Sequence, residues 1–517
     1  MISDHTLSSP LFVPDSLKFY VNRLSFSKNR VRLQALSSKV ASAGSQVIVR
    51  LPSNTMINLA SLTMTGKVRA YFPEQPPDGT NGCALPTNWD FSFIETLSLI
   101  ANGGIITQPF TNYKLLANIL NDCYGSNDQD QKRSALQGSL PCPISARAAV
   151  PADQQGGWLP FSINNWVSAT QTMAPSYIST NLLGDLELRL TMTDNGVVQA
   201  GKVADNAAAA SRPAWEMDEI NFYIETASIG NNLVDQAVAA KLAAGEPINV
   251  PFENVFSFSQ VNAAGPTFNQ RFSVSSQSVN KIIVTTQRNI DINSGSSSNK
   301  FNNGIPQVLK RHSCGMTSAQ FSVNNQYSPN YQIDSNIING FDPVDRSNNN
   351  NYQASNALVE TRAAMDIPDY DYDCSDKLCT CPAMPPEFFG GVQIIPADTA
   401  ANQSTYINPP SLEITQAAAF GTGGSGYVKN QHTYWQPITH KYPLKNYFED
   451  KFVVATSFDF DVADKDRLVS GINTLGSNAQ MFYNSIGIGN TANTSTVFVL
   501  CTSMVQIYAG ATLKIIQ

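Results

Sequence analysis

Residues 185–193 read Asp-Leu-Glu-Leu-Arg-Leu-Thr-Met-Thr. Every second side chain from Leu186 to Met192 is apolar, and the side chains between them are charged or polar. Successive side chains of a β-strand point to opposite faces, so this stretch predicts a strand with one buried face and one wet face. Residues 61–72 alternate in the same way. We therefore expect a protein built from half-buried strands.

Other stretches that alternate, or that are rich in β-branched and aromatic residues, predict further strands. These lie at residues 17–26, 46–51, 93–100, 219–226, 248–259, 271–286, 451–462, 480–488, 496–505 and 506–516. The sequence Asn102-Gly103-Gly104 supplies the positive φ angles of a tight hairpin turn. Helices are expected at residues 112–123 and 231–244, and Gly245 suits the left-handed cap that ends the second one.

The chain of 517 residues is too long for one hydrophobic core and predicts two large domains. We place the first domain at residues 1–245, with an N-terminal arm and the connecting helix, and the second at residues 246–517. Between about 289 and 430 the chain is rich in Ser, Asn and Gly runs, which predicts long insertions between strands of the second domain. The predicted fold class is all-β, with two consecutive sandwiches, short helices and long loops.

Charged residues are scarce, at 14% of the chain against about a quarter in an average soluble protein. A neutral polar surface suits large subunit contacts, because interface cores are depleted in charge. Residues 1–50 nevertheless hold seven basic and two acidic residues, a net charge of +5, so the remainder carries −12. The basic residues all fall in 16–50. They predict either a face that meets nucleic acid or an acidic membrane, or an edge strand protected by positive charges.

Sequence motifs for catalysis are weak. Residues 421–426 fit the pattern GxGxxG, but no helical period follows them, so we interpret them as a flexible loop. The patterns GxxxxGK[ST] and HExxH do not occur, and the four histidines are too scattered to predict a base beside a nucleophile. We predict no catalytic residue, no cofactor-binding residue, no small-molecule substrate and no enzyme.

Two clusters could hold a metal ion, and neither has a standard spacing. Cys374, Cys379 and Cys381 form one, with His312 and Cys314 as a distant pair; the alternatives are a zinc site, a disulfide formed after release, or free thiols. Acidic residues alternate in the other, at Asp369, Asp371, Asp373 and Asp376, which is either a calcium site or a solvated acidic loop. We assign no metal ligand.

Several landmarks together resemble the double jelly-roll major capsid proteins of double-stranded DNA viruses, above all those of virophages and polinton-like viruses. In the first half they are Phe93-Ile94-Glu95 through Asn102-Gly103, Tyr113 with Leu116, and Pro160-Phe161 followed by Leu183-Gly184-Asp185-Leu186. In the second half they are Gly245-Glu246-Pro247-Ile248, Pro251-Phe252, and Phe458 to Phe460 followed by Ser470-Gly471-Ile472-Asn473-Thr474. The region 289–430 departs from the family pattern.

The resemblance implies two eight-stranded jelly rolls and a homotrimer of near-hexagonal outline that tiles an icosahedral shell. The implied partners are further copies of the chain, neighbouring capsomers, and minor capsid or penton proteins. Residues 16–50 are candidates for contact with the genome or an internal membrane. Met1–Asp15 has no signal-peptide pattern, so we expect synthesis in the host cytoplasm and a final location in the virion. Two alternatives remain: a tandem sandwich that binds glycans or a receptor, and a carbohydrate hydrolase using acids of 369–376.

Overall fold

The structure is a computed structural model. It describes residues 26–71, 82–84, 89–102, 104–107, 109–124, 144–147, 158–174, 176–200, 214–229, 233–289, 309–314, 316–323, 356–367, 447, 451–458, 471–476, 480–487, 492–510 and 512–516. All of the predicted strand at 17–26 except Phe26, and most of the predicted insertions at 289–430, lie outside these residues. The predicted all-β class is confirmed, because two sandwiches of antiparallel sheets make up most of the described chain.

The first sandwich has a large sheet in the order β1-β13-β4-β10, with β2 beside β13 and β9 beside β4. The facing sheet has the order β3-β11-β6-β7. The strands of the large sheet are β1 (Phe26–Gln34), β2 (Ala41–Ser42), β4 (Met56–Tyr71), β9 (Leu159–Ile163), β10 (Tyr177–Ser179) and β13 (Ala214–Ile229). The strands of the facing sheet are β3 (Gln46–Arg50), β6 (Ile94–Ala101), β7 (Gly104–Ile105) and β11 (Leu186–Met192).

The second sandwich has a large sheet in the order β14-β20-β16-β18, with β21 beside β20, and a facing sheet in the order β15-β19-β17. The strands of the large sheet are β14 (Ile248–Asn262), β16 (Val279–Arg288), β18 (Val454–Ser457), β20 (Asn493–Tyr508) and β21 (Thr512–Ile516). The strands of the facing sheet are β15 (Thr267–Ser273), β17 (Met316–Val323) and β19 (Gln480–Gly487).

A small third sheet and a few helices complete the described structure. The small sheet has the order β12-β5-β8, formed by β5 (Gly82–Ala84), β8 (Ile144–Arg147) and β12 (Gln199–Ala200). The helices are α2 (Trp89–Ser92), α3 (Tyr113–Tyr124), α5 (Ala169–Thr172), α6 (Thr180–Leu183), the short 3-10 helix η2 (Asn195–Val197), α7 (Leu233–Ala243) and α10 (Asn356–Ala364). Both predicted helices are confirmed, as α3 and α7, and Gly245 after α7 has a φ of +81°.

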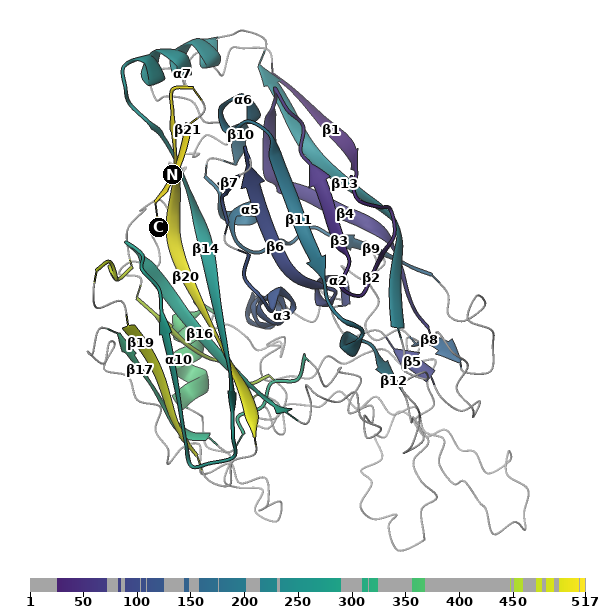
Figure 1. Ribbon diagram of the computed structural model, residues 1–517, viewed down its shortest axis with the longest axis vertical. Coiled ribbons are helices and arrows are strands. Elements are labelled where there is room, and N and C mark those ends of the chain that lie inside the picture. The colour runs from purple at the N-terminus through teal and green to yellow at the C-terminus, as the bar shows by residue number, and fades with distance from the viewer. Residues whose placement is uncertain are drawn as a thin grey trace, which may run out of the picture.

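The two sandwiches stand side by side with their long strands running along the molecule, and α7 joins them at one end (Figure 1). We call this end the α7 pole. At the opposite end the chain leaves and re-enters the sandwiches through the long connections 72–93, 193–213 and 289–315. We call that end the loop pole. The α7 pole carries the α7 linker and short turns such as 51–55 and 274–278.

The predicted alternation corresponds to burial in the first sandwich. In β11 the side chains of Leu186, Leu188 and Leu190 are buried, while Glu187 and Arg189 between them are partly exposed. Leu62, Met64, Val68 and Ala70 of β4 are buried in the same way. Burial of each such side chain is worth about 1.5–3 kcal/mol, so the pattern that defines the strands also supplies the stability of the core.

Two predicted boundaries in the second half are wrong. The stretch 271–286 is not one strand but β15 and β16, in different sheets, separated by a turn in which Ser276 N donates to Thr474 Oγ1 at 3.1 Å. Serines fill this turn, so no Gly or Pro marked it. The predicted break after Val505 is also misplaced, because β20 runs to Tyr508 and the turn contains Gly510 at a φ of +78°.

Candidate assembly surfaces

One seam fixes the two sandwiches to each other. It lies along the edge of β14 that does not pair with β20, where residues 168–174 of the first sandwich cover the strand. Ala174 N donates to the carbonyl of Pro251 at 2.9 Å, and Glu253 N donates to Thr172 Oγ1 at 2.8 Å. Ser168 Oγ donates to the carbonyl of Glu253 at 3.0 Å. An open strand edge invites pairing with other chains, and here the molecule covers its own edge.

The seam explains two unusual backbone positions. The carbonyl of Pro251 faces the seam and not β20. In a β-strand the N–H and C=O of one residue point to the same side, so the nitrogen of Pro251 also faces the seam. The N–H that proline lacks would therefore not have bonded to β20. Ser168 has a φ of +72°, a conformation that costs a non-glycine residue on the order of 1–3 kcal/mol. Its contact with Glu253 helps to hold this conformation.

Replacing Thr172 with Val is expected to lower the free energy of unfolding by about 0.5–1.5 kcal/mol, because the Glu253 N–H loses its protein acceptor at the seam. Urea unfolding followed by circular dichroism measures this difference. Thr172→Ser is the matched control, since it keeps the hydroxyl, and it should unfold close to the wild-type midpoint. Loss of stability in the Ser variant but not in the Val variant would show that the methyl group, and not the hydrogen bond, matters here.

A buried ion cluster crosses the same boundary between the sandwiches. Asp122, on α3 of the first sandwich, contacts Arg311 through Nη2 and Lys451 through Nζ, the latter at 3.1 Å. Their side chains are only 10%, 2% and 8% exposed, respectively. Arg311 and Lys451 lie on adjacent backbone segments joined by a parallel bridge. One carboxylate thus bridges two cations that belong to the other sandwich.

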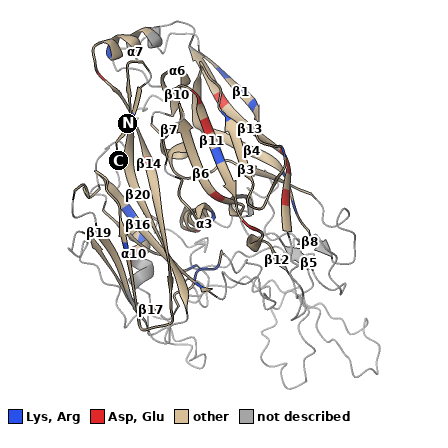
Figure 2. Ribbon diagram, viewed as in Figure 1, with Lys and Arg blue, Asp and Glu red and all other residues tan. Residues whose placement is uncertain are grey.

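The outer face of the large sheet of the first sandwich carries a ladder of charges; we call it the flank. Lys28 bonds Glu225 at 2.9 Å, and Lys67 bonds Glu219 at 2.8 Å. Hydrogen bonds to Tyr177 and then to Glu225 raise the pKa of Lys28, and Lys28 in turn holds the pKa of Glu225 below its usual value. Figure 2 shows these basic and acidic positions interleaved along β1, β13 and β4.

The described part of the basic segment does not form one patch. Lys28, Arg30 and Arg32 lie on the flank along β1, while Lys39 precedes β2 and Arg50 ends β3 at the α7 pole. Arg32 donates from Nε and Nη2 to Asn221 Oδ1, at 3.0 and 2.8 Å. β1 is an edge strand, so the prediction of positive charges that protect an edge fits this part of the segment.

No protein-family model matches the sequence, and no curated protein matches it. Among solved structures the chain is similar to VP54 of PBCV-1, fitted into a cryo-EM reconstruction of the virophage Sputnik, with 10% identity, 95% of this chain and 97% of that chain covered, and a TM-score of 0.50. It is also similar to the mavirus major capsid protein, with 10% sequence identity and a TM-score of 0.41; the similarity covers 100% of this chain and 93% of that chain.

The strand order decides the fold. In each sandwich the first long strand pairs with the last long strand inside one sheet, β1 with β13 and β14 with β20. The strands between them in sequence are shared between that sheet and the facing one, so the chain wraps around both sheets. The chain is a double jelly roll. Its two jelly rolls point the same way, since β1 and β14 both start at the α7 pole and β13 and β20 both end there.

Most residues weighed as metal ligands or catalytic groups lie outside the described part of this double jelly roll. They are Cys374, Cys379, Cys381, Asp369, Asp371, Asp373, Asp376, His5, His432, His440 and the run 421–426. The described residues contain no group of three His, Cys, Asp or Glu that could hold a metal ion. No helix within the described ranges is long and apolar enough to cross a membrane.

His312 is the one described histidine, and the second jelly roll uses it as a structural group. Its Nδ1 accepts a hydrogen bond from Cys314 N at 2.7 Å, and its carbonyl accepts from Thr286 Oγ1. Burial, and then the charges of Arg288 and Lys310, lower the pKa of His312 to about 3. The ring is therefore neutral at pH 7 and its Nδ1 lone pair is occupied, which leaves that nitrogen neither a base nor a ligand.

Proposed function

We propose that this chain is a major capsid protein, whose homotrimers form pseudo-hexagonal capsomers that tile an icosahedral virus shell. The observation that carries the proposal is the pair of parallel jelly rolls locked side by side by the seam and the Asp122 cluster. A rigid two-lobed block gives six lobes when three copies close into a ring. VP54, a solved structure to which the chain is similar, is described as fitted into a cryo-EM reconstruction of the virophage Sputnik.

We infer that the protein works by geometry and not by catalysis. Polar groups at the boundary between the sandwiches make structural contacts: Asp122 bridges two cations, and Thr172 and Ser168 hold the seam. A shell repeats one contact many times, so each contact can be modest while the assembly is stable. On this proposal the protein needs no cofactor and no small-molecule substrate.

The proposal includes the partners and the location of the protein. It expects neighbouring capsomers and minor capsid or penton proteins at the outer edges of the trimer, in a virion assembled after synthesis in the host cytoplasm. Residues 16–50 stay candidates for contact with the genome or an internal membrane. The division into domains 1–245 and 246–517 also stays a prediction; α7 (233–243) precedes that boundary and β14 follows it.

The oligomeric state tests the proposal. Three chains of 56.1 kDa, about 168 kDa together, should elute as one species that persists on dilution to nanomolar concentration, because an interface well above ~2,000 Å² dissociates slowly. Light scattering coupled to size exclusion measures the mass, and electron microscopy of concentrated trimer should show hexagonal outlines. A single species of one chain across this range would contradict the capsid role and favour the tandem sandwich that binds glycans or a receptor.

A further inference from the structure

The flank has the side-chain composition of a protein–protein contact. Its cations stack on aromatic rings: Arg30 lies 5.5 Å from the ring centre of Tyr223, and Arg69 lies 4.8 Å from that of Trp158. Lys67 lies 5.0 Å from the same indole. Arginine, tyrosine and tryptophan are the residue types enriched in interface cores and among residues that dominate binding energy. These stacks hold the long side chains in place before any partner arrives, which reduces the entropy lost on binding.

The charges of the flank argue against a polyanion as its ligand. Five cations, Lys28, Arg30, Arg32, Lys67 and Arg69, are interleaved with the four acids Glu216, Asp218, Glu219 and Glu225. Phosphate backbones bind surfaces of one sign, because the affinity comes from neutralising several phosphates at once. A ladder of both signs that nearly cancels suits instead another polypeptide with a similar mixture of charges.

Exposed apolar side chains adjoin the flank at one corner. Leu36 and Val40, in the turn between β1 and β2, are 61% and 50% exposed. Their backbone is held firmly, since Leu36 N donates to the carbonyl of Ile48 at 2.7 Å and Ile220 N donates to that of Lys39 at 3.1 Å. The two apolar groups are therefore presented by a pinned segment, as expected of a contact that is buried in an assembly.

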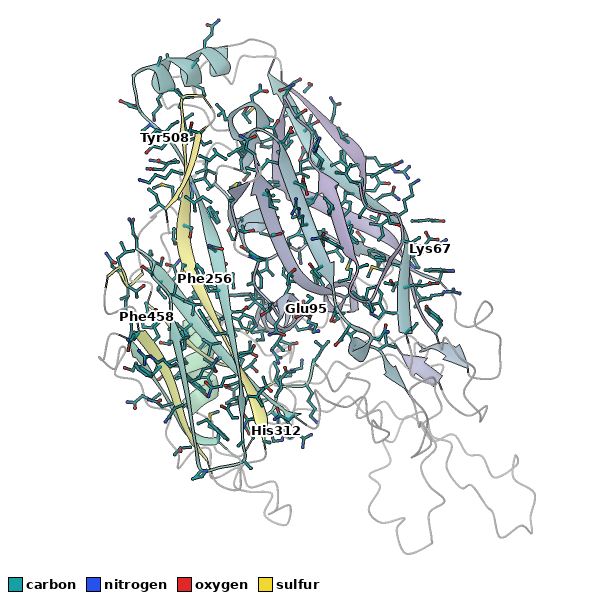
Figure 3. All side chains as sticks on the ribbon, viewed as in Figure 1. Lys67, Glu95, Phe256, His312, Phe458 and Tyr508 are labelled. Carbon is teal, nitrogen blue, oxygen red and sulfur yellow. The ribbon has the colours of Figure 1, made fainter. Side chains whose placement is uncertain are left out.

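The area and the position of the flank fit a subunit contact. Its central strands β4 and β13 are 16 residues long and the outer strands β1, β9 and β10 are shorter, so the sheet covers on the order of 800 Å² at about 3.3 Å per residue and about 4.8 Å per strand. Stable interfaces bury about 800 Å² per partner. Figure 3 shows Lys67 projecting on the side of the first jelly roll that is turned away from the second. A ring of two-lobed subunits must make its contacts through such outer sides.

We propose that the flank, with the Leu36 and Val40 corner, is the surface through which one copy contacts a second copy within the trimer. This inference rests on the proposed capsid function and names the contact that the trimer would use. It also gives the cations of β1 a role in assembly that does not require the genome.

The test compares two double variants, both at apolar side chains that are at least half exposed. Leu36→Asp with Val40→Asp changes the flank corner, and Val261→Asp with Leu475→Asp, at positions 72% and 50% exposed in the second jelly roll, is the matched control. The mass of wild type and both variants is followed by light scattering from micromolar to nanomolar concentration. Circular dichroism and thermal melting show that each variant is folded.

We expect the flank variant to dissociate with a constant raised at least about a hundredfold, since each apolar side chain removed from an interface costs about tenfold or more. The control should stay trimeric. A folded flank variant that is as trimeric as wild type would overturn the inference while leaving the capsid proposal standing; a monomeric wild type would remove that proposal itself. A third outcome would also overturn the inference. If the wild type binds duplex DNA at physiological salt, and the double variant Arg30→Glu with Arg32→Glu loses this binding but stays trimeric, the flank is a site for a polyanion.

Discussion

Asp122→Asn is expected to lower the free energy of unfolding by about 3–5 kcal/mol, measured by denaturant unfolding at pH 7. The amide would leave Arg311 and Lys451 as two buried cations with no carboxylate between them. Removing one partner of a buried ion pair costs far more than the pair contributes, because the remaining charge keeps its desolvation penalty. Among the described residues, Nε and Nη1 of Arg311 have no other hydrogen-bond partner to compensate the loss.

The same change should loosen the seam. Asp122 belongs to α3 of the first jelly roll, whereas Arg311 and Lys451 belong to the second, so the change removes the ionic link across the boundary and leaves the seam hydrogen bonds to hold it. We expect calorimetry to resolve the single wild-type transition into two in the variant. Trimer formation should weaken as well, because the capsid proposal requires the two lobes to keep a fixed geometry.

Two controls identify the cause. Asp185→Asn removes an exposed carboxylate at the α7 pole and should leave stability within about 0.5 kcal/mol of wild type. Combining Asp122→Leu with Arg311→Met and Lys451→Met removes all three charges, and it should recover much of the loss, since apolar groups of similar volume replace buried ion pairs well. A triple variant as unstable as Asp122→Asn would show that packing of α3, and not charge, sets the cost.

Much of the fold could be predicted because strand period and burial agree. Leu188 and Leu190 are apolar where the sheet is covered, and Glu187 and Arg189 are polar where it is open. The turn at Asn102 could be predicted for a similar reason. Its φ of +49° is a local backbone property, and asparagine is one of the residue types that adopt such a positive φ. These features depend on neighbours within a few residues, which the sequence shows directly.

The strand β1 could not be predicted by the same means. Its apolar residues, Val31 and Leu33, are only partly buried, and its other positions are mostly exposed, because it lies at the edge of the sheet. The register with β13 gives the strand its place, by pairing Phe26 to Gln34 with Ile229 to Asn221. Those partners are about two hundred residues away in the sequence, so no local sequence pattern predicts the pairing.

The candidate surfaces were beyond sequence reasoning for a related reason. Thr172 and Glu253 each look like an ordinary polar residue, and only the docking of the two jelly rolls makes one the acceptor of the other. Asp122 gave a weak signal, as the one acidic residue of α3, which buries many apolar side chains. Its two cationic partners are separated from it by 189 and 329 residues, so the cluster follows from topology and not from spacing.

The pH dependence of stability should reveal His312. Its pKa is about 3 in the folded protein, against 6.5 for an exposed histidine, so between these values the unfolded chain binds a proton that the folded chain does not. Stability from this group is constant above pH 6.5 and falls as the pH drops toward 3, at about 1.4 kcal/mol per pH unit. By about pH 4.5 the loss should be about 2–3 kcal/mol.

The loss has a structural cause besides burial. A protonated Nδ1 carries a hydrogen and can no longer accept from Cys314 N, so charging the ring also breaks the hydrogen bond that holds residues 312–314. His312→Asn keeps an acceptor oxygen near that position but cannot be protonated in this range. Carboxylates across the protein also titrate below about pH 5, and the difference between wild type and variant cancels their contribution. The urea concentration at the unfolding midpoint should fall more steeply from about pH 7.5 to 4.5 for the wild type than for His312→Asn. If the two proteins lose stability equally over this range, His312 becomes charged within the folded protein and its surroundings accommodate the proton.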